Sequence, residues 1–400
     1  GLGSDTNTVS RNVEAVVSNS DVNAKAFEID AKSMQGISSF VVGAGVAGIG
    51  GGVAGVVTVT DLANTTKAAL FNSNVTANTV DVTADHKGIV NAGNVGVGAA
   101  GIGAGVGLSV GVLKDNSETY ALVSNDSTEE KSIVAAGDVS ISAQNTTTVK
   151  PSISATGAGV AGVAGATSIN NLNSKVVTDL ANANIISKSG SIHGTANNTF
   201  NIEAYMGSQA GGAVGVGAGV TVNTIDSTVQ MNVSDSELQA AQNVALTADE
   251  TRNIQQTATN VAAGGAAIGA NIAITTVGKE ITDSDVLAEI DRANNALVNE
   301  DTQENNASAL LNGAGDALKT AGIEESSVTP SIGAEYGGGK DSQITVNISN
   351  SNVTGSAIKA EAAEHDVIDM TLGSGSAGGV AINAGVGILD VNRNVGVHIT

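Results

Sequence analysis

Cysteine and tryptophan are absent from the 400 residues, and the chain has only 3 Tyr, 4 Phe and 2 Pro. Without cysteine there are no disulfide bonds and no thiolate metal sites, a composition that suits a protein exported in an unfolded state. Large aromatic side chains supply much of the burial energy of an ordinary domain. We therefore expect many thin layers of Val, Ala and Ile in place of one thick core.

Charged residues are also sparse, at 14% of the chain, against about 25% in a typical soluble domain. The 17 basic and 39 acidic side chains give a net charge of −22 without any block of like charge. Nucleic-acid binding needs clustered Lys and Arg, and an anionic membrane repels an acidic chain, so neither partner is expected. Dispersed acidity keeps a β structure with many edges in solution.

What the chain has in abundance is glycine, with 51 residues, and a repeated strand pattern. The pattern apolar-x-apolar-x-Ala occurs six times, at Phe27–Ala31, Val80–Ala84, Val139–Ala143, Phe200–Ala204, Val244–Ala248 and Ile358–Ala362. Successive starts lie 53, 59, 61, 44 and 114 residues apart, and the last interval holds one unit plus an insertion. Repetition at such periods indicates stacked structural units.

A second motif, Asn-Ser-x-Val, begins eight residues before three of these anchors, at Asn19, Asn72 and Asn350. Val134 holds the matching valine five residues before the third anchor. Residues 75–84 then predict a strand, a two-residue turn at Asn78-Thr79 and a second strand. Alternation places Val and Ala inward and polar side chains outward.

Each anchor is followed by glycine alternating with Val, Ile or Ala, as in residues 101–108. Such a strand has one aliphatic face and one bare face, which lets another backbone approach closely. Because glycine weakens an isolated strand, the units must be held by stacking on their neighbours. The predicted fold class is all-β, a β-helix-like β-solenoid rod, and a 53- to 61-residue repeat is long enough for two or three coils.

The repeat stops once, between Gly278 and Asp341. Asp283-Ser284-Asp285 predicts a helix N-terminus before an apolar stripe, and residues 307–321 predict a second helix. An insertion on a solenoid is equally a binding face or a decoration without a partner. The expected organisation is solenoid repeats over 1–278, a helical hairpin over 279–341 that projects from the rod, and a continuing repeat over 342–400.

Residues 43–48 fit the dinucleotide pattern G-x-G-x-x-G, but the match recurs in later glycine tracts, so we expect no nucleotide site. The histidines have no metal-ligand spacing and are interpreted as solvated turn residues; they are His86, His193, His365 and His398. The acidic pairs Glu129-Glu130 and Glu324-Glu325 lack the aromatic platforms that sugars prefer. Calcium stays open, because Asp- and Asn-rich turns can bind it although no known calcium loop is present. No catalytic residue, cofactor site or metal site is predicted.

Residues 40–60 form an uncharged run of 21 residues, which is long enough for a membrane helix. Seven of these residues are glycine, and similar runs recur beside the strand anchors without aromatic belts. We therefore expect buried strands and no membrane insertion.

The two motifs occur in tandem, with Asn72 to Asp85 joining Asn-Ser-x-Val to Val-x-Val-x-Ala-Asp and Val42 to Ala47 typical of the tracts. On these residues nearly the whole chain, except the insertion, resembles the repeat region of large bacterial exoproteins of the filamentous-haemagglutinin and fusobacterial leukotoxin type. The resemblance implies secretion across a Gram-negative envelope to the outer cell surface, a right-handed β-helical shaft and attachment to host or bacterial cells. It carries over no catalytic residue.

The function expected from the sequence is that of a non-enzymatic shaft of a giant adhesin, which holds a binding element for host-cell or bacterial receptors tens of nanometres from the cell. The alternatives are a membrane-active secreted toxin region and a carbohydrate-processing β-helix enzyme. The chain has no initiator Met and resembles an internal portion of a longer protein. Residues 1–17 and 388–400 share one repeat phase, so repeats are expected to continue at both ends, and uncapped edges favour end-to-end association.

Overall fold

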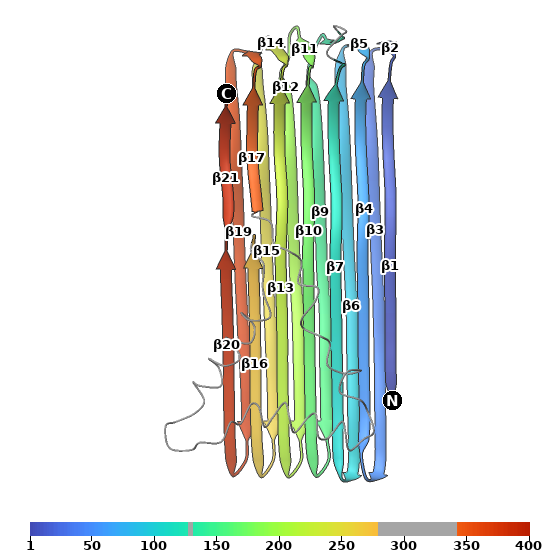
Figure 1. Cartoon of the computed structure of the whole chain (residues 1–400), viewed down its shortest axis with the longest axis vertical. Helices are drawn as coiled ribbons and strands as arrows, with labels where there is room; N and C mark the ends of the chain where they lie inside the picture. Colours follow the sequence, from blue (N-terminus) through green and yellow to red (C-terminus); the bar gives the residue numbers. More distant parts are fainter. Residues whose placement is uncertain (127–130, 279–341) are drawn as a thin grey trace.

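The computed structural model describes residues 1–126, 131–278 and 342–400, and all regular structure in these ranges is parallel β-strand (Figure 1). The strands form three sheets, which we call A, B and C. Sheet A contains β1 (Leu2–Ser18), β4 (Gly52–Phe71), β7 (Ala104–Ser124), β10 (Ala161–Ala181), β13 (Val214–Ser234), β16 (Ala266–Val277), β17 (Ser342–Ser349), β20 (Val380–Val391) and β21 (Arg393–Ile399).

Sheet B consists of short strands, β2 (Asp21–Asn23), β5 (Asn74–Ala77), β8 (Ser132–Ala135), β11 (Asn184–Ser187), β14 (Glu237–Ala240) and β18 (Asn352–Thr354). Sheet C is again long, with β3 (Ala26–Ile49), β6 (Thr79–Ile102), β9 (Val139–Ala158), β12 (Ile192–Gly211), β15 (Asn243–Ala263) and β19 (Ala357–Ala377). One coil runs through A, B and C and returns to A by a short turn, so the all-β solenoid is confirmed. The predicted helical hairpin lies outside the described residues.

Each repeat makes a single coil, and the prediction of two or three coils per repeat is wrong. Ala26 of β3 pairs with Thr79 of β6, and Leu2 of β1 pairs with Gly55 of β4, so one coil uses 53 residues. The prediction failed because strands usually have about 5 to 6 residues, whereas β3 has 24 and β4 has 20.

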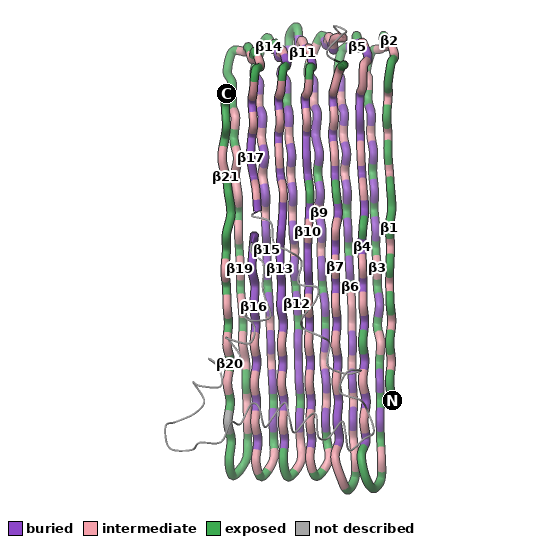
Figure 2. Tube along the Cα trace, in the orientation of Figure 1, coloured by how far each residue is buried: buried purple, intermediate pink, exposed green. Residues whose placement is uncertain are grey.

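The described residues are therefore a flat slab whose longest axis follows the strands (Figure 1). A strand of 21 residues such as β10 extends about 70 Å at 3.3 Å per residue. The seven levels of sheet A, from β1 to β20, span only about 30 Å at 4.8 Å per step. Burial is greatest in the middle levels and falls toward the two outer coils (Figure 2).

The fourth strand anchor is Ile192 and not Phe200. Ile192 pairs with Val139 on one side and with Val244 on the other, while Phe200 lies eight residues farther along β12 opposite Thr147. The pattern search missed the true anchor because Gly194 takes the place of its second apolar residue. With Ile192 in place, the intervals of 61 and 44 residues become 53 and 52.

The third unit also departs from the predicted spacing. Ile133, not Val134, pairs with Val75 and is buried, so Val134 points outward. Three residues separate β8 from β9, whereas Asn78 alone separates β5 from β6. The predicted two-residue turn is thus a one-residue corner, because Thr79 already belongs to β6.

The Asn-Ser motif forms the corner between sheets A and B. Backbone φ is positive at five corner residues, Asn19, Asn72, Asn182, Asp235 and Asn350, a conformation that Asn and Asp adopt more readily than other non-glycine residues. Ser73 Oγ accepts a hydrogen bond from Ser20 N at 3.0 Å and donates to Phe71 O at 2.7 Å. The same pair of bonds recurs at Ser351, so this motif links successive coils at the corner.

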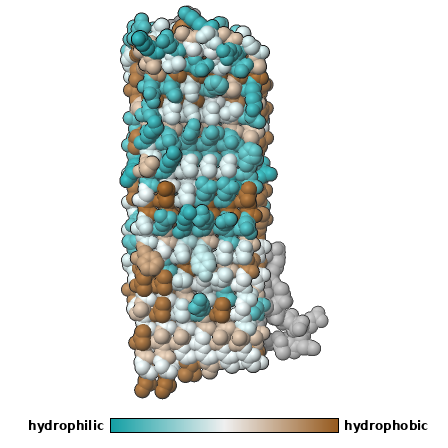
Figure 3. All heavy atoms as spheres, turned by 180° about the vertical axis from the view of Figure 1, so that it is seen from behind, coloured by the Kyte–Doolittle hydropathy of each residue, from teal (hydrophilic) through white to brown (hydrophobic). Residues whose placement is uncertain are grey.

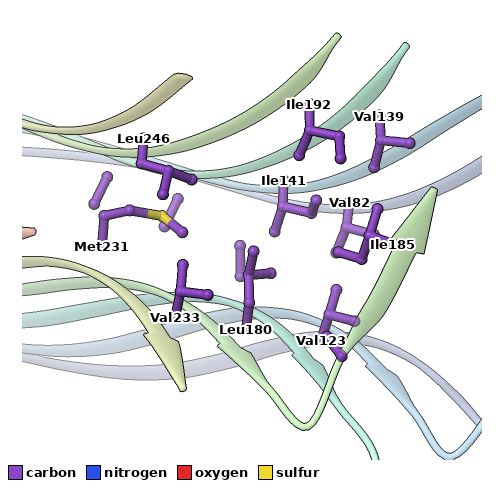
Figure 4. Packing of buried hydrophobic residues seen from close by; sticks show 14 of the residues in the cluster. Val82, Val123, Val139, Ile141, Leu180, Ile185, Ile192, Met231, Val233 and Leu246 are labelled. Carbon is purple, nitrogen blue, oxygen red and sulfur yellow. The ribbon is translucent and has the colours of Figure 1, made fainter. Parts of the chain in front are cut away.

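Inside the coil, apolar and polar layers alternate along the strands. Sheets A, B and C enclose an aliphatic core, part of which Figure 4 shows, with Ile141, Leu180, Ile185 and Leu246 packed toward one another. Farther along the strands, a second apolar layer includes Leu62, Leu172 and Ile254. Buried Asn, Ser, Thr and charged side chains lie between these layers.

At the end opposite sheet B, glycine brings sheets A and C into backbone contact, as the alternation predicted. A Cβ atom added at Gly98 would lie 1.9 Å from Val106 O, and one at Gly157 would lie 1.9 Å from Val163 O. No real Cβ atom approaches a carbonyl oxygen so closely. Each coil therefore narrows from a three-sided aliphatic end to a two-sheet glycine end.

Replacing Gly157 by Ala should lower the free energy of unfolding by roughly 1 to 3 kcal/mol or more, because the new methyl group forces the sheets apart. Gly211 in the adjacent coil has no atom within 4 Å of an added Cβ. Gly211→Ala should be neutral or slightly stabilising. Urea unfolding followed by circular dichroism measures both, and equal effects would contradict the close approach.

Asp115 is the one acidic side chain within the second apolar layer of sheet A, since its partners at the same level are Leu62 and Leu172. Burial raises the pKa of Asp115 to about 6, although Ser117 and Thr147 donate hydrogen bonds to it. A raised carboxyl pKa gives a contribution to stability that is complete below about pH 4 and is lost as the pH rises through 6.

Asp115→Asn should therefore change stability in a pH-dependent way. Relative to the wild type, the variant should gain roughly 3 kcal/mol between pH 3 and pH 8, because a pKa displacement of about two units is worth that much. Chemical denaturation at both pH values measures the difference. A difference between variant and wild type that does not change with pH would refute a titrating, buried Asp115.

Candidate functional site at the insertion point

Residues 279–341 interrupt one strand of sheet A without interrupting the solenoid. Both β16 and β17 pair with β13, Ile225 opposite Val277 and Thr228 opposite Gln343. The pairing offset rises from 52 residues to 115 across the break, so 63 residues are inserted. Only Asp226 and Ser227 of β13 face the break, and β17 completes the strand that β16 begins.

The strand ends at the break remain hydrogen-bonded. Gly278 N donates to Ile225 O at 2.9 Å, and Asn392 N in the next coil donates to Val277 O at 2.8 Å. Ser342 Oγ accepts a bond from Ser227 N at 3.3 Å. The chain therefore leaves and re-enters the sheet at neighbouring points of one coil.

A charged cluster lies in the coil interior beneath this break. Arg252 of β15 is fully buried and forms ion pairs with Glu250 and Glu364. It also contacts Asp366 Oδ1 at 3.1 Å. Arg393 of β21, whose side chain is 46% exposed, approaches Asp366 Oδ2 at 2.8 Å and Glu364 Oε2 at 2.9 Å. Three carboxylates are thus shared between two guanidinium groups.

Ser227 connects this cluster to the strand that faces the break. Its Oγ donates to Glu250 Oε2 at 2.7 Å and accepts a bond from Arg252 Nη2 at 2.9 Å. A row of amides extends the network into two earlier coils, because Asn145 Nδ2 donates to Asn198 Oδ1 and Asn198 Nδ2 donates to Glu250 Oε1, each at 2.8 Å. The cluster and the row bind sheets A and C together across four coils.

Electrostatics in the cluster follow from its burial. Burial raises the pKa of Glu250, although Arg252 and the hydrogen bonds of Ser227 and Asn198 oppose this. Burial likewise raises the pKa of Glu364, against the attraction of Arg252. Burial alone would lower the pKa of Arg252, but Glu250, Asp366 and Glu364 outweigh it and raise that pKa.

The arrangement is suited to holding strands together, because its charges are paired with one another inside the coil. Glu250 and Arg252 are not accessible to solvent, and the Glu364 and Asp366 side chains are only 5% and 13% exposed. A general acid or base must reach the atom to which it transfers a proton. Among these groups, only Arg393 offers a large exposed surface.

Two shallow grooves cross the outer faces of the sheets. One lies on sheet A, has a volume of about 230 Å³ and is lined by Asn116, Lys175 and Asp226 among others. The other lies on sheet C and is lined by Asn201, Glu203 and neighbouring polar residues. Sheet C presents wide polar bands between paler, less polar ones (Figure 3). Both grooves are partly open to solvent.

The sequence analysis predicted that the four histidines are turn residues, and this prediction is wrong. All four lie in strands. His86 is buried in β6, and burial lowers its pKa. His193 and His398 are exposed in β12 and β21, and His365 Nε2 lies 3.8 Å from Asp249 Oδ1. The prediction failed because strands of this length carry polar side chains in their interiors, where shorter strands would have ended.

The remaining candidate motifs have different outcomes. Residues 43–48 lie within β3, and the described residues contain no helix that could present its N-terminus to a phosphate. Within the described ranges, no three His, Asp or Glu side chains gather as a metal site, and no helix could span a bilayer. Glu129-Glu130 and Glu324-Glu325 lie outside the described residues.

Sequence reasoning missed the charged cluster, although a signal was present. The alternation that places Val244, Leu246 and Ala248 inward also places Glu250 and Arg252 inward two and four residues later. A carboxylate and a guanidinium at inward positions of one strand indicate a buried ion pair. The equivalent anchors at Val244 and Ile358 align Glu364 and Asp366 of β19 with this pair, so these partners could also be found from the sequence.

Arg252→Met should destabilise the protein by roughly 3 to 5 kcal/mol, because it leaves buried carboxylates without their partner. The matched control is Lys150→Met, which removes an exposed ion pair with Glu203 at 2.8 Å. That change should cost less than about 1 kcal/mol. Guanidinium unfolding would show both losses, and a small effect at Arg252 would rule out a stabilising cluster.

No protein family, curated protein or solved structure matches this chain.

Proposed function

We propose that this chain is a non-enzymatic shaft segment of a giant bacterial adhesin, secreted or held at the outer cell surface, that presents binding elements to host or bacterial cells. The observation that carries the proposal is the unbroken parallel pairing of coil on coil, in which β4 to β16 are each hydrogen-bonded to the coil before and the coil after. The motif resemblance to filamentous-haemagglutinin-like and leukotoxin-type exoproteins supports the same function.

The mechanical basis is shared load along the stacking axis. Backbone hydrogen bonds between coils run parallel to that axis, since strands lie perpendicular to it. Corner serines such as Ser73 and Ser236 add bonds in the same direction, and interior amides add further ones. Pulling the ends of the shaft apart therefore loads many bonds at once.

The wide coil sets the length that such a shaft can supply. Each coil of 53 residues adds about 4.8 Å, so roughly 1,100 residues are needed for every 100 Å of reach. The described levels contribute only about 30 Å, and a thin rod is not their shape. A stalk tens of nanometres long requires a giant protein, and its broad faces provide display surface in return.

A second candidate, a membrane-active toxin region, is favoured by the glycine end of the slab. Between the last charge of each sheet C strand and the next charge along the chain, six stretches are free of charge, at residues 33–60, 88–113, 151–174, 204–225, 253–278 and 370–389. Aliphatic side chains are exposed there, including Ile49 at 84%, Ile102 at 65% and Val380 at 62%. An uncharged apolar rim of this kind suits contact with lipid.

The shaft proposal predicts a β-dominated circular-dichroism spectrum and, in electron images, flat particles about 70 Å wide along the strand direction. Beads coated with the chain should bind target cells, and deleting residues 279–341 tests whether the insertion carries that binding. A helical spectrum or a compact globular particle would exclude the shaft. Loss of binding without loss of shape would assign adhesion to the insertion.

The membrane candidate predicts leakage of a dye from zwitterionic liposomes. Ile49→Asn with Ile102→Asn, which places amides on the exposed rim, should then abolish the leakage. A shaft segment should release no dye in either form. Rapid leakage that the double variant abolishes would replace the shaft by the membrane-active function.

A further inference from the structure

Sheet C carries a mostly polar groove on the face that points away from the coil interior. The groove crosses four consecutive strands, β9, β12, β15 and β19, and has a volume of about 490 Å³. Its floor is the backbone around Ile202 and Ile254, whose side chains are buried in the second apolar layer. We define the sheet C groove by its lining residues, Thr148, Asn201, Ile202, Glu203, Asn253, Ile254, Gln255, Val367 and Asp369.

The two walls of the groove are rows of side chains in register along the stacking axis. The first row is paired from strand to strand and contains Thr148, Asn201, Asn253 and Val367. The second row lies two residues farther along the strands and contains Glu203, Gln255 and Asp369. Neighbouring side chains in a row are about 4.8 Å apart, because that is the distance between strands. The groove therefore offers hydroxyl, amide and carboxylate groups at a constant step.

Contacts within the groove leave part of this hydrogen-bonding capacity for a ligand. Asn253 Nδ2 donates to Asn201 Oδ1 at 3.0 Å, and the Asn201 amide nitrogen and the Asn253 amide oxygen can still bond outward. Glu203 is paired with Lys150, whose Nζ lies 2.8 Å from Oε2. The lining residues include no cation, and Asp369 adds a negative charge. An anionic ligand is therefore not favoured.

An exposed aromatic side chain lies beside the second row. Tyr205 is 47% exposed and comes two residues after Glu203 in β12. Its hydroxyl oxygen lies 3.3 Å from Thr259 Oγ1 in the next coil. A Cβ atom added at Gly207 would lie 3.5 Å from Tyr205 Cε1, so the ring leans along the strand over this glycine. One ring face is thus turned toward solvent, as in the aromatic platforms that sugars prefer.

We propose that the sheet C groove binds an extended neutral oligosaccharide, laid along the stacking axis with one sugar for each strand. A pyranose unit with its linkage is similar in length to the strand spacing of about 4.8 Å, so successive sugars meet the same two rows. Sugar hydroxyl groups both donate and accept, which suits amides and carboxylates. The C–H face of a sugar can pack on the Tyr205 ring.

A peptide fits this groove less well than a sugar chain does. Extended peptides bind a sheet by adding a strand to a free edge. The strands β9, β12 and β15 are hydrogen-bonded on both sides, so the groove has no free edge. A regular polymer of hydroxyl-bearing units matches the constant step of the rows without needing main-chain bonds.

With this groove, the shaft is itself a receptor for cell-surface glycans and not only a spacer. In that role the inference rests on the proposed adhesin function, whereas the binding chemistry does not. Contacts at several coils add up along one sugar chain, because each later contact is intramolecular once the first has formed.

An array of neutral and acidic oligosaccharides of increasing length tests the inference with the whole chain. Neutral chains should bind, with an affinity that rises up to about four sugar units, one for each strand crossed, and then levels off. Asn253→Ala with Gln255→Ala should weaken binding about tenfold, because two hydrogen-bonding groups are lost. The matched control, Gln144→Ala with Gln209→Ala, removes two exposed amides of the same face outside the groove and should leave binding unchanged.

Tyr205→Ala gives a second readout, since it should weaken binding severalfold without altering the preferred length. Circular dichroism of every variant checks that the solenoid is intact. The inference is overturned if no neutral chain binds, if only acidic chains or extended peptides bind, or if groove and control variants lose affinity equally. Coated beads that still bind cells in that case leave the adhesin proposal standing, whereas array binding without cell binding counts against the adhesin proposal alone.

Discussion

In-register parallel pairing is the constraint on which the rest of the structure depends. Each side chain has, as its nearest neighbours across strands, the residues at the same level of the coils before and after. Residues at one position along the strands therefore form a column that runs through all the coils, and they share a similar environment. A residue that differs in polarity or size from the others in its column changes the packing of the residues above and below it. Asp115 between Leu62 and Leu172 is such a residue, since no other charge of its own column balances it.

The cross-section follows from how close the two long sheets can come. Where Gly98 and Gly157 face carbonyl groups, the sheets meet backbone to backbone. At the other end, sheet B separates them and makes room for an aliphatic core. A chain with few large side chains can fill such a wedge, because most of its length is too narrow to need them. The scarcity of large side chains in the composition thus matches the narrow, wedge-shaped interior.

The sequence predicted the all-β solenoid because alternation, glycine tracts and corner motifs repeat at a nearly constant interval. It did not predict that each repeat makes one coil. An alternation of period two does not mark where a strand ends, and β3 continues for 24 residues. The anchor at Ile192 was missed because Gly194 interrupts the apolar alternation.

The candidate site could be predicted only in part. The inward–outward alternation of β15 places Glu250 and Arg252 inward, and this could be predicted from the sequence of the strand. The anchors at Val244 and Ile358 align Glu364 and Asp366 with them, whereas Arg393 is placed only once the pairing of β17 with β21 is known. Arg393 lies on β21, which carries none of the six anchors, so the repeat pattern does not place it.

The charged cluster also explains how a strand can be opened in its middle without loss of register. A slip of β19 by one residue would turn Glu364 and Asp366 to the outer face and leave Arg252 without two of its three carboxylates. Apolar columns tolerate such exchanges more easily, because Val, Ile and Leu substitute for one another at modest cost. Buried charges are costly to desolvate, and that cost is met only in one alignment. The most specific pairing therefore lies in the coil whose sheet A strand is interrupted by the insertion.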